Sequence, residues 1–327
     1  MFNRACNRAV CSTLSLCLFG CAACHSSRAP LIAVIPETTA QELWESEHAG
    51  VESEARRWGW RVYWNAPSRE DDIARQIQIV NQEIGREVDG LVLSPDHANA
   101  LIAPVRRALA NRIPTVILGS RLDIQPDSRL HLVLNDEEAD GRLAAHRAEL
   151  YLRPSSTIAV LGVDPNLAGS VERADALERD IRARFPDAHV IVRRLTNFDF
   201  AQAEEVAEEV IHSQAGLTVI VSLTVVQTRG AYQALLDTQT VRRIKLIGCD
   251  QDLDLLHHLR TGGIDALIAE NTYQMGADAM EIIHRVKNGQ TVANEVVQPI
   301  LITREDVDAG SVQQVLSMDW TAKQDTP

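Results

Sequence analysis

The sequence predicts an α/β protein of two doubly wound parallel-sheet lobes, joined by a hinge at which the chain crosses between them more than once. Three observations predict this fold. At 327 residues the chain is too long for one small core and suits two domains. Short apolar runs alternate with longer amphipathic stretches, and most runs begin about 25 to 30 residues apart, the length of a βαβ unit. The alternation is interrupted once, near residue 130.

The apolar runs are expected to be strands. Runs that are apolar on both sides suit parallel sheets that helices cover on both faces. In chain order the expected strands are 31–35, 60–64, 89–94, 114–118, 157–163, 189–195, 217–223, 244–249 and 265–270. The stretches between them have the spacing of amphipathic helices. In DDIARQIQIVNQEIGR, for example, Ile73, Ile77, Val80 and Ile84 fall on one helix face.

The interruption marks where the chain is expected to pass between the lobes. After the run 114–118, the apolar run LHLVL (130–134) follows without room for a helix, and the alternation restarts at Asp136. Near the end, a helix from about Tyr273 to Asn288 precedes a last apolar run, 296–302. We therefore expect an N-terminal lobe of residues 30–135 with 271–295, a C-terminal lobe of 136–270 with 296–315, and a tail, 316–327.

Composition and charge exclude several functional classes. A net charge of −13 argues against nucleic-acid binding, which needs a basic surface. Beyond the N-terminus, no stretch approaches the roughly 18 continuous apolar residues of a transmembrane helix. The chain lacks the G-x-G-x-x-G, G-x-x-x-x-G-K-[ST] and G-x-S-x-G motifs. Adjacent histidines, His257 and His258, cannot share one helix face. We therefore expect no cofactor, no metal site and no catalytic residue.

The N-terminus has the pattern of a secretory leader. Arg4 and Arg8 precede an apolar core from Ala9 to Gly20, which is too short to span a bilayer and suits a signal peptide. Five of the six cysteines crowd into this region, so the cysteines do not form a disulfide framework. We expect residues 1–29 to be a signal peptide with a short tether.

The leader ends in L-F-G-C, which resembles the bacterial lipobox. Leu18, Gly20 and Cys21 match its aliphatic, small and acylated positions, so Cys21 is the expected site of lipid attachment. Cys24 is the second candidate. The rival interpretation is a redox C-x-x-C pair, Cys21 with Cys24. Such pairs work at the start of a helix packed on a sheet, whereas this pair lies at the end of a leader.

Eight short segments in order along the body resemble those of one family. They are IPETTAQELW, VDGLVLSP, RIPTVILGS, NDEEADGRLAA, SVERADALE, NFDF, LIGCD and ALIAENTYQMG. From about residue 31 to 303 the chain resembles the type I periplasmic sugar-binding proteins of the ribose-binding-like group, whose fold also forms the effector domain of LacI-type repressors. A repressor would carry a helix-turn-helix before LIAVI, where this chain has a leader.

The resemblance implies an exported solute-binding protein of an ABC importer, lipid-anchored in the cell envelope or periplasm and monomeric. It would capture a sugar or a related small polar solute between its lobes and close by hinge motion. Its partners would be an ABC permease and, through the lipid, the membrane. One alternative partner is a chemoreceptor or sensor kinase. Another alternative is an exported carbohydrate-active enzyme with Asp250 and Glu270 as its paired carboxylates.

Trp44 is an expected ligand contact. Thr39 and Glu42 fit the capping box S/T-x-x-E, which places Trp44 in the first turn of a helix. A helix that starts after the carboxyl end of a strand faces the cleft. In the family, an aromatic side chain at this place stacks on the sugar. The alternative is that Trp44 packs on the buried helix face with Val51 and Ala55.

The resemblance places further polar and aromatic residues beyond the strand ends. Sugar hydroxyls both donate and accept hydrogen bonds, so sugar sites need inward-facing carboxylates, amides and hydroxyls. The expected ligand contacts besides Trp44 are Glu37, Gln41, Ser120, Asp136, Phe198, Thr224, Asp250 and Glu270. Asp250 is the strongest of these, because a carboxylate directly after a buried strand is costly unless it binds something or caps a helix.

Several positions depart from the ribose-binding pattern. Where ribose binders carry Asp-Arg after the fourth strand, this chain has Gly119 and Ser120, and their cleft arginine falls on Val171. Arg173 is close by, but an arginine there is more often structural in the family. Thr224 replaces an asparagine. These departures predict a different ligand, either a larger or less hydroxylated sugar or a non-sugar polar solute; the alternative is drift in a protein that no longer transports.

Overall fold

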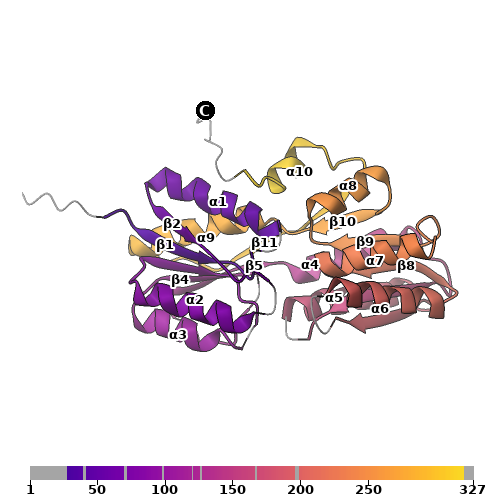
Figure 1. Ribbon diagram of the computed structural model, residues 1–327, viewed down its shortest axis with the longest axis horizontal. Helices are drawn as coiled ribbons and strands as arrows, with labels where there is room; N and C mark the ends of the chain where they lie inside the picture. The colour runs from indigo at the N-terminus through magenta and orange to yellow at the C-terminus, as the bar shows by residue number, and fades with distance from the viewer. Residues whose placement is uncertain are drawn as a thin grey trace, which may run out of the picture.

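The computed structural model describes residues 28–39, 42–69, 72–97, 99–119, 121–125, 127–165, 168–195 and 199–319. Two α/β lobes lie side by side along the long axis of the molecule (Figure 1). Each lobe contains one six-stranded sheet between layers of helices. The prediction of two doubly wound lobes is therefore confirmed. None of the described helices is both long and apolar enough to cross a membrane.

The N-terminal lobe is built on a fully parallel sheet with the strand order β11-β5-β4-β3-β1-β2. Its strands are β1 (Leu31–Ile35), β2 (Arg61–Trp64), β3 (Gly90–Leu93), β4 (Thr115–Gly119), β5 (Leu130–Asn135) and β11 (Glu295–Val297). Its helices are α1 (Leu43–Trp58), α2 (Ile73–Gly85), α3 (Ile102–Ala110) and α9 (Thr272–Lys287).

Alternation along β1 shows how both faces of this sheet are covered. Ile32 and Val34 pack in the core under α1 and α9, whereas Ala33 and Ile35 pack in the core under α2 and α3. Successive strand residues point to opposite faces, so a strand buried on both sides must be apolar throughout. The run LIAVI meets this requirement.

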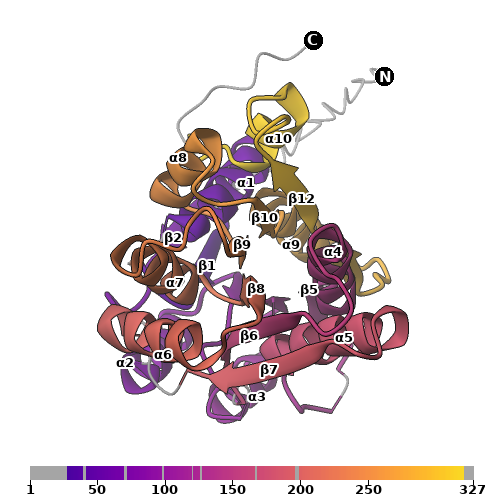
Figure 2. The same ribbon diagram turned by 90° about the vertical axis from the view of Figure 1, so that its right-hand side faces the viewer.

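The C-terminal lobe has the strand order β12-β10-β9-β8-β6-β7, parallel except for the β10–β12 pair. Its strands are β6 (Thr157–Val163), β7 (His189–Arg194), β8 (Leu217–Ser222), β9 (Lys245–Cys249), β10 (Ala266–Ala269) and β12 (Ile300–Thr303). Its helices are α4 (Glu137–Glu149), α5 (Ala168–Arg184), α6 (Phe200–Ser213), α7 (Val225–Asp237), α8 (Leu253–Thr261) and α10 (Gly310–Val315). Figure 2 shows α4 and α5 on one side of this sheet and α6 and α7 on the other.

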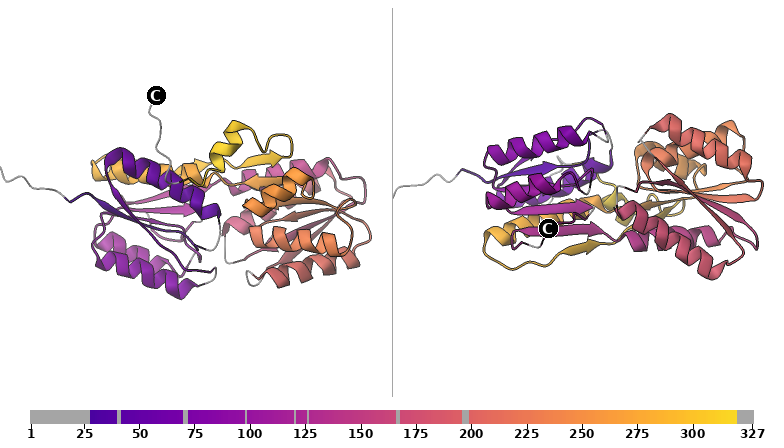
Figure 3. Two further views of the ribbon diagram at one scale, coloured as in Figure 1. Left: turned by 45° about the horizontal axis from the view of Figure 1, so that its top comes forward. Right: turned by 90° about the horizontal axis from the view of Figure 1, so that it is seen from below.

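The described chain passes between the lobes at three places, which lie together between the two sheets (Figure 3). It leaves the first sheet after β5, returns after β10, and leaves again between β11 and β12. The expected last change of lobe followed residue 295. In the structure Val296 and Val297 still pair with β5, and β12 begins only at Ile300. The apolar run 296–302 is thus two short strands in two different sheets, separated at Gln298 and Pro299.

Glycines allow the helices that border the space between the lobes to pack closely. A Cβ atom on Gly276 of α9 would lie 2.4 Å from the backbone oxygen of Glu47 on α1. A Cβ atom on Gly141 of α4 would lie 2.2 Å from the backbone oxygen of Arg173 on α5. Both distances are far below van der Waals contact, so neither position accepts a side chain without a shift of backbone. These contacts fix the backbone that carries Glu47 and Arg173.

Candidate functional site

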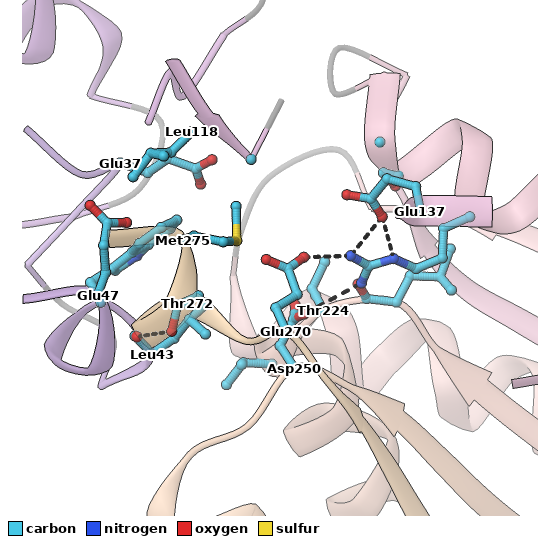
Figure 4. Close-up of a pocket in the computed structure, with 17 residues that line it drawn as sticks. Glu37, Leu43, Glu47, Leu118, Glu137, Thr224, Asp250, Glu270, Thr272 and Met275 are labelled. Carbon is cyan, nitrogen blue, oxygen red and sulfur yellow. Dashed lines mark hydrogen bonds and ion pairs between the residues drawn. The ribbon is translucent and has the colours of Figure 1, made fainter. Parts of the chain in front are cut away.

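A pocket lies between the lobes, where the carboxyl ends of strands from both sheets meet (Figure 4). It contains about 800 Å³ of space, counting the open solvent at its mouth. The N-terminal lobe contributes Glu37, Trp44, Glu47 and Met275, and the C-terminal lobe contributes Glu137, Arg173, Thr224, Asp250 and Glu270. This is the place at which doubly wound sheets bind ligands, and a ligand here would touch both lobes.

The structure brings together most of the predicted ligand contacts that it describes. Glu37, Trp44, Thr224, Asp250 and Glu270 all line the pocket. The remaining candidates except Asp136 fall outside the described residues; they are Gln41, Ser120, Phe198 and the expected lipid-attachment residue Cys21.

Asp136 does not line the pocket; it caps helix α4. Its Oδ1 accepts a hydrogen bond from the backbone N–H of Ala139 at 2.8 Å, which makes it the N-cap of α4. Its Oδ2 accepts a hydrogen bond from the side-chain amide of Gln298 at 3.0 Å. Asp136 lies at the first crossing and Gln298 at the third, so their hydrogen bond ties these two crossings together. Asp136 was expected to contact the ligand because it follows a strand, but its carboxylate caps the next helix instead.

Trp44 lies in the first turn of α1, as predicted, but the predicted capping box is wrong. Helix α1 begins at Leu43, and the side chain of its N-cap residue, Glu42, makes no capping hydrogen bond. The hydroxyl of Thr39 donates instead to the carbonyl oxygen of Pro67 at 3.2 Å. The segment before α1 is therefore held by the loop after β2, a contact between distant residues that a local motif does not encode.

The Trp44 side chain lines the pocket, and its indole nitrogen has no hydrogen-bond partner among the described residues. Only 9% of its surface is exposed, yet it lines the pocket and is not part of the apolar cluster that contains Val51 and Ala55. Within the described part of the chain, its indole Nε1 is buried without a hydrogen-bond acceptor. A buried donor without a partner costs about 1–3 kcal/mol. A ligand oxygen in the pocket would remove that cost.

Glu47 is a pocket residue that the sequence analysis missed. It follows Trp44 by three positions, which places both on one face of α1. Its Oε2 accepts a hydrogen bond from the hydroxyl of Ser94 at 3.2 Å, while Oε1 is buried without a partner among the described residues. Burial raises the pKa of Glu47 to about 8. In the sequence, only its spacing of three residues from Trp44 indicated that Glu47 lies at the pocket. Glu47 lies in the acidic segment ESEHAG, which has the composition of a solvent-exposed helix face.

Arg173, which the sequence analysis treated as more often structural, organises the wall of the C-terminal lobe. Its side chain is buried and four carboxylates surround it. Nε donates to Oε2 of Glu137 at 2.9 Å, and Nη2 donates to Oε1 of Glu270 at 2.7 Å. Nη1 lies 3.4 Å from Oδ1 of Asp250, and Nη2 lies 3.3 Å from Oδ2 of Asp140. Figure 4 shows Glu137, Asp250 and Glu270 on this side of the pocket.

One guanidinium does not neutralise this many carboxylates, so the cluster retains protons. Burial raises the pKa of Glu270 well above its usual range, and the neighbouring carboxylates Asp250 and Glu137 raise it further. Burial also raises the pKa of Asp250, and it raises the pKa of Asp140 to about 7. In each case the charge of Arg173 lowers the pKa but does not offset the burial. These carboxyl groups therefore titrate as a coupled set.

Asp250 adopts an uncommon backbone conformation that turns it to the pocket. Its φ is +64°, in the left-handed region, which aspartate tolerates better than most residues. The alternative, that Asp250 caps the next helix, is wrong: α8 is capped by Asp252, whose Oδ1 accepts from the backbone N–H of Leu255 at 2.7 Å. Its carboxylate faces Arg173 instead. Strained residues of this kind concentrate at functional sites.

The carboxylates of Glu137, Asp140 and Glu270 have the spacing of a metal site, but a cation already stands between them. One oxygen of each lies within 4.8 Å of the others. Nη2 of Arg173 is 2.8 Å from Glu137, 3.3 Å from Asp140 and 2.7 Å from Glu270. The guanidinium therefore occupies the position that an ion would need.

Thr224 lines the pocket while it caps a helix. Its Oγ1 accepts a hydrogen bond from the backbone N–H of Gln227 at 3.1 Å, at the start of α7. A threonine hydroxyl carries one donor as well as its acceptors, so capping leaves the O–H available to a ligand.

Comparison with known proteins gives consistent matches over the body of the chain. Residues 32–291 match the family model described as periplasmic binding protein domain. The D-allose-binding periplasmic protein of Escherichia coli (strain K12) is 22% identical over 286 residues, which cover 83% of this chain and 91% of that protein. The ribose import binding protein of Bacillus subtilis (strain 168) is also 22% identical, over 77% of this chain and 79% of its own length.

Solved structures share the fold. A carbohydrate transporter solute binding protein from Agrobacterium radiobacter, in complex with D-arabinose, superposes with a TM-score of 0.82 at 20% identity; the match covers 89% of this chain and all of that one. An ABC transporter solute binding protein from Agrobacterium vitis with bound D-fucose gives a TM-score of 0.79 at 22% identity, over 88% of this chain and 100% of its own.

Proposed function

The chain belongs to the periplasmic binding protein domain family, and from this premise we propose that it captures a sugar or a related small polar solute for an ABC importer. The observation that carries the proposal is the pocket itself. It lies between the lobes; a residue with a buried indole N–H that has no acceptor among the described residues lines one wall, and carboxyl groups line the other. The relatives named above are binding proteins, and two of the matched structures hold monosaccharides.

The pocket offers the chemistry that a hydroxylated solute requires. Carboxylates accept hydrogen bonds from hydroxyl groups, and the Trp44 indole and the Thr224 hydroxyl donate to hydroxyl oxygens. The apolar side chains of Met275 and Leu43 cover part of the N-terminal wall, where the C–H faces of a sugar ring would lie. We propose Glu37, Trp44, Glu47, Thr224, Asp250 and Glu270 as ligand contacts.

Hinge closure follows from where these residues stand. Glu37, Trp44 and Glu47 belong to one lobe, and Thr224 and Asp250 belong to the other. A ligand that bonds to both sets binds the closed arrangement more tightly than the open one, and it therefore shifts the population toward closure. The permease would then recognise the closed form.

Placement in the periplasm follows from the family, and attachment to the membrane is our further proposal. Cys21 within L-F-G-C would carry the lipid and tether a monomer to the cell envelope. Replacing Cys21 with alanine should abolish incorporation of labelled palmitate into the protein and release it from the membrane fraction. Labelling that persists in the variant would contradict this assignment, and labelling that is lost only when Cys24 is replaced would move it to that residue.

Thermal unfolding of the purified protein against a panel of monosaccharides, polyols and nucleosides tests the function. A ligand present at about 100 times its dissociation constant should add about 2.7 kcal/mol to the free energy of unfolding. The shift should vanish in Trp44→Phe and Asp250→Asn and persist in Glu138→Gln, which removes an exposed carboxylate outside the pocket. Failure of every compound to raise the melting temperature would contradict a small polar ligand.

A further inference from the structure

The charge of the pocket wall restricts the ligand more narrowly than its shape does. Among the described residues that line the pocket, five side chains carry carboxyl groups, namely Glu37, Glu47, Glu137, Asp250 and Glu270. Arg173 is the one lysine or arginine among the same described residues. An anionic ligand would have to enter against this excess of acidic groups.

Arg173 does not compensate by binding the ligand itself. A guanidinium has five N–H donors, and here all three nitrogens are already engaged. Nε and Nη2 donate to Glu137 and Glu270, and Nη1 donates to the carbonyl oxygen of Leu223 at 3.1 Å and to Asp250 at 3.4 Å. The cation is therefore committed to holding the carboxylates in place. What remains for a ligand is mainly a set of hydrogen-bond acceptors.

The acidic groups stand on both sides of the pocket. Figure 4 shows Glu37 and Glu47 on the side of the N-terminal lobe and Asp250, Glu270 and Glu137 on the opposite side. The carboxyl group of Glu270 meets Arg173 with one oxygen and directs the other across the pocket. When these carboxyl groups are ionised, the like charges on the two facing walls repel as the walls approach, and this repulsion grows as water is excluded. A positive charge between them would reverse the interaction.

Orphaned polar atoms give an independent sign of a ligand. Oε1 of Glu47, a residue that is only 1% exposed, has no hydrogen-bond partner among the described residues, and neither has Nε1 of Trp44 on the same helix face. Native proteins pair nearly all buried polar atoms, so such atoms beside a pocket call for a partner. Once Glu47 is ionised, its Oε1 is an acceptor, and the Trp44 N–H is a donor, as an amine and a hydroxyl on one molecule would require.

We propose that the solute carries an ammonium group on a hydroxylated frame, an amino sugar in chemical class, with the cation held between Glu37 and Glu47 of one lobe and Glu270 of the other. The inference rests on the proposed function and narrows its ligand. The hydroxyl groups would donate to the remaining carboxylates and accept from Trp44. The cation would stabilise the ionised carboxylates on both walls and so favour closure of the lobes.

Binding of such a solute is coupled to protons. Without ligand, burial raises the pKa of Glu47 to about 8 and that of Glu270 well above its usual range. A nearby ammonium group favours the ionised carboxylates, so it lowers both pKa values and expels protons. The groups facing Glu270 are Asp250, Glu137, Asp140 and Arg173. Burial raises the pKa of Asp250 and of Asp140 as well, so these two carboxyl groups respond in the same direction. Affinity for a cation therefore rises with pH toward about 8.

Matched pairs of sugars test the inference by isothermal titration calorimetry. D-glucosamine, D-galactosamine and D-mannosamine are each compared with the parent sugar and with its neutral N-acetyl derivative. At pH 7 at least one amino sugar should bind about tenfold or more tightly than both neutral partners, a difference of about 1.4 kcal/mol. Its affinity should increase between pH 5.5 and pH 7, where the amine itself stays charged, and binding should release protons.

Two variants test whether Glu47 and Glu270 bind the ammonium group. Glu47→Gln and Glu270→Gln keep the shape of the side chain, and each should reduce the preference for the amino sugar over its parent by about tenfold. Glu138→Gln, on the exposed face of α4, is the control and should leave the preference unchanged. A melting curve of each variant verifies that it folds.

The outcomes separate the two proposals. Equal or tighter binding of the neutral sugars overturns the inference and leaves the proposed function intact. If both glutamine variants still prefer the amino sugar to its parent, Glu47 and Glu270 do not bind the ammonium group, and that assignment is overturned. If neither the amino sugars nor their neutral partners bind, the result contradicts both the amino-sugar inference and the sugar ligand of the proposed function.

Discussion

Arg173 and Glu270 form an ion pair, with 2.7 Å between Nη2 and Oε1, that joins helix α5 to the second crossing between the lobes. Oε1 of Glu270 also lies 3.5 Å from the side-chain amide of Asn135, the last residue of β5 at the first crossing. The charged centre of the pocket is therefore attached to two of the three connections about which the lobes would move. A ligand that engages Glu270 acts directly on the hinge.

Replacing Arg173 with alanine should destabilise the fold strongly. The change leaves buried carboxylates without their cation, and breaking one side of a buried charge cluster typically costs about 3–5 kcal/mol. Urea unfolding at pH 7 measures the loss. The control is Arg179→Ala, an exposed arginine on the same helix, which should change the free energy of unfolding by no more than about 0.5 kcal/mol. A loss below about 1 kcal/mol in the Arg173 variant would show that the cluster adds little stability.

The stability of the ligand-free protein should depend on the protonation of Glu47. Its pKa is raised from 4.5 to about 8, so between these pH values the folded state retains a proton that the unfolded state has lost. The contribution of Glu47 to the free energy of unfolding is fully present below pH 4.5. It decreases as the pH rises toward 8, with a limiting slope of about 1.4 kcal/mol per pH unit.

Glu47→Gln should flatten this dependence, because glutamine does not titrate. Urea unfolding at pH 5, 6, 7 and 8 gives the comparison, and the variant should gain relative to the wild type as the pH increases. Parallel pH profiles for the two proteins would place the pKa of Glu47 near its ordinary value and contradict the burial argument.

Glu42 should strengthen the closed arrangement. Its Oε2 accepts a hydrogen bond at 2.9 Å from the backbone N–H of Leu253, in the first turn of α8 on the opposite lobe. An anion at a helix N-terminus contributes about 0.3–1 kcal/mol. Glu42→Ala should therefore weaken ligand binding about two- to fivefold by calorimetry. Glu45→Ala, on the same helix, should have no effect on binding, and equal affinities in the two variants would show that the contact does not influence closure.

The sequence predicted the architecture well because parallel sheets leave a strong local signal. Strands such as β1 and β6 are buried on both faces and must be continuous apolar runs at regular spacing. The last crossing was less predictable. The apolar run 296–302 looks like one strand, and only pairing with β5 on one side and β10 on the other divides it.

Apart from Trp44, the predicted residues that line the pocket all follow strand ends. Asp250 and Glu270 come directly after β9 and β10, and Glu37 comes two residues after β1, so topology alone brings them to one edge. Glu47 and Arg173 lie within helices, and their burial depends on contacts with distant segments, such as the bond from Ser94 to Glu47. No local pattern marks such contacts. Asp136 was wrongly expected to contact the ligand, because a residue that follows a strand can equally cap the next helix.

In the mechanism that we propose, one small polar solute binds to both lobes at once. Calorimetric titration of the tightest ligand from the panel into wild type, Trp44→Phe and Asp250→Asn tests it most directly, because each variant changes one lobe. We expect each substitution to weaken binding by about tenfold or more, while Glu138→Gln should bind like the wild type. Undiminished affinity in either pocket variant would mean that the ligand contacts one lobe alone or binds elsewhere, and would contradict closure around a bridging solute.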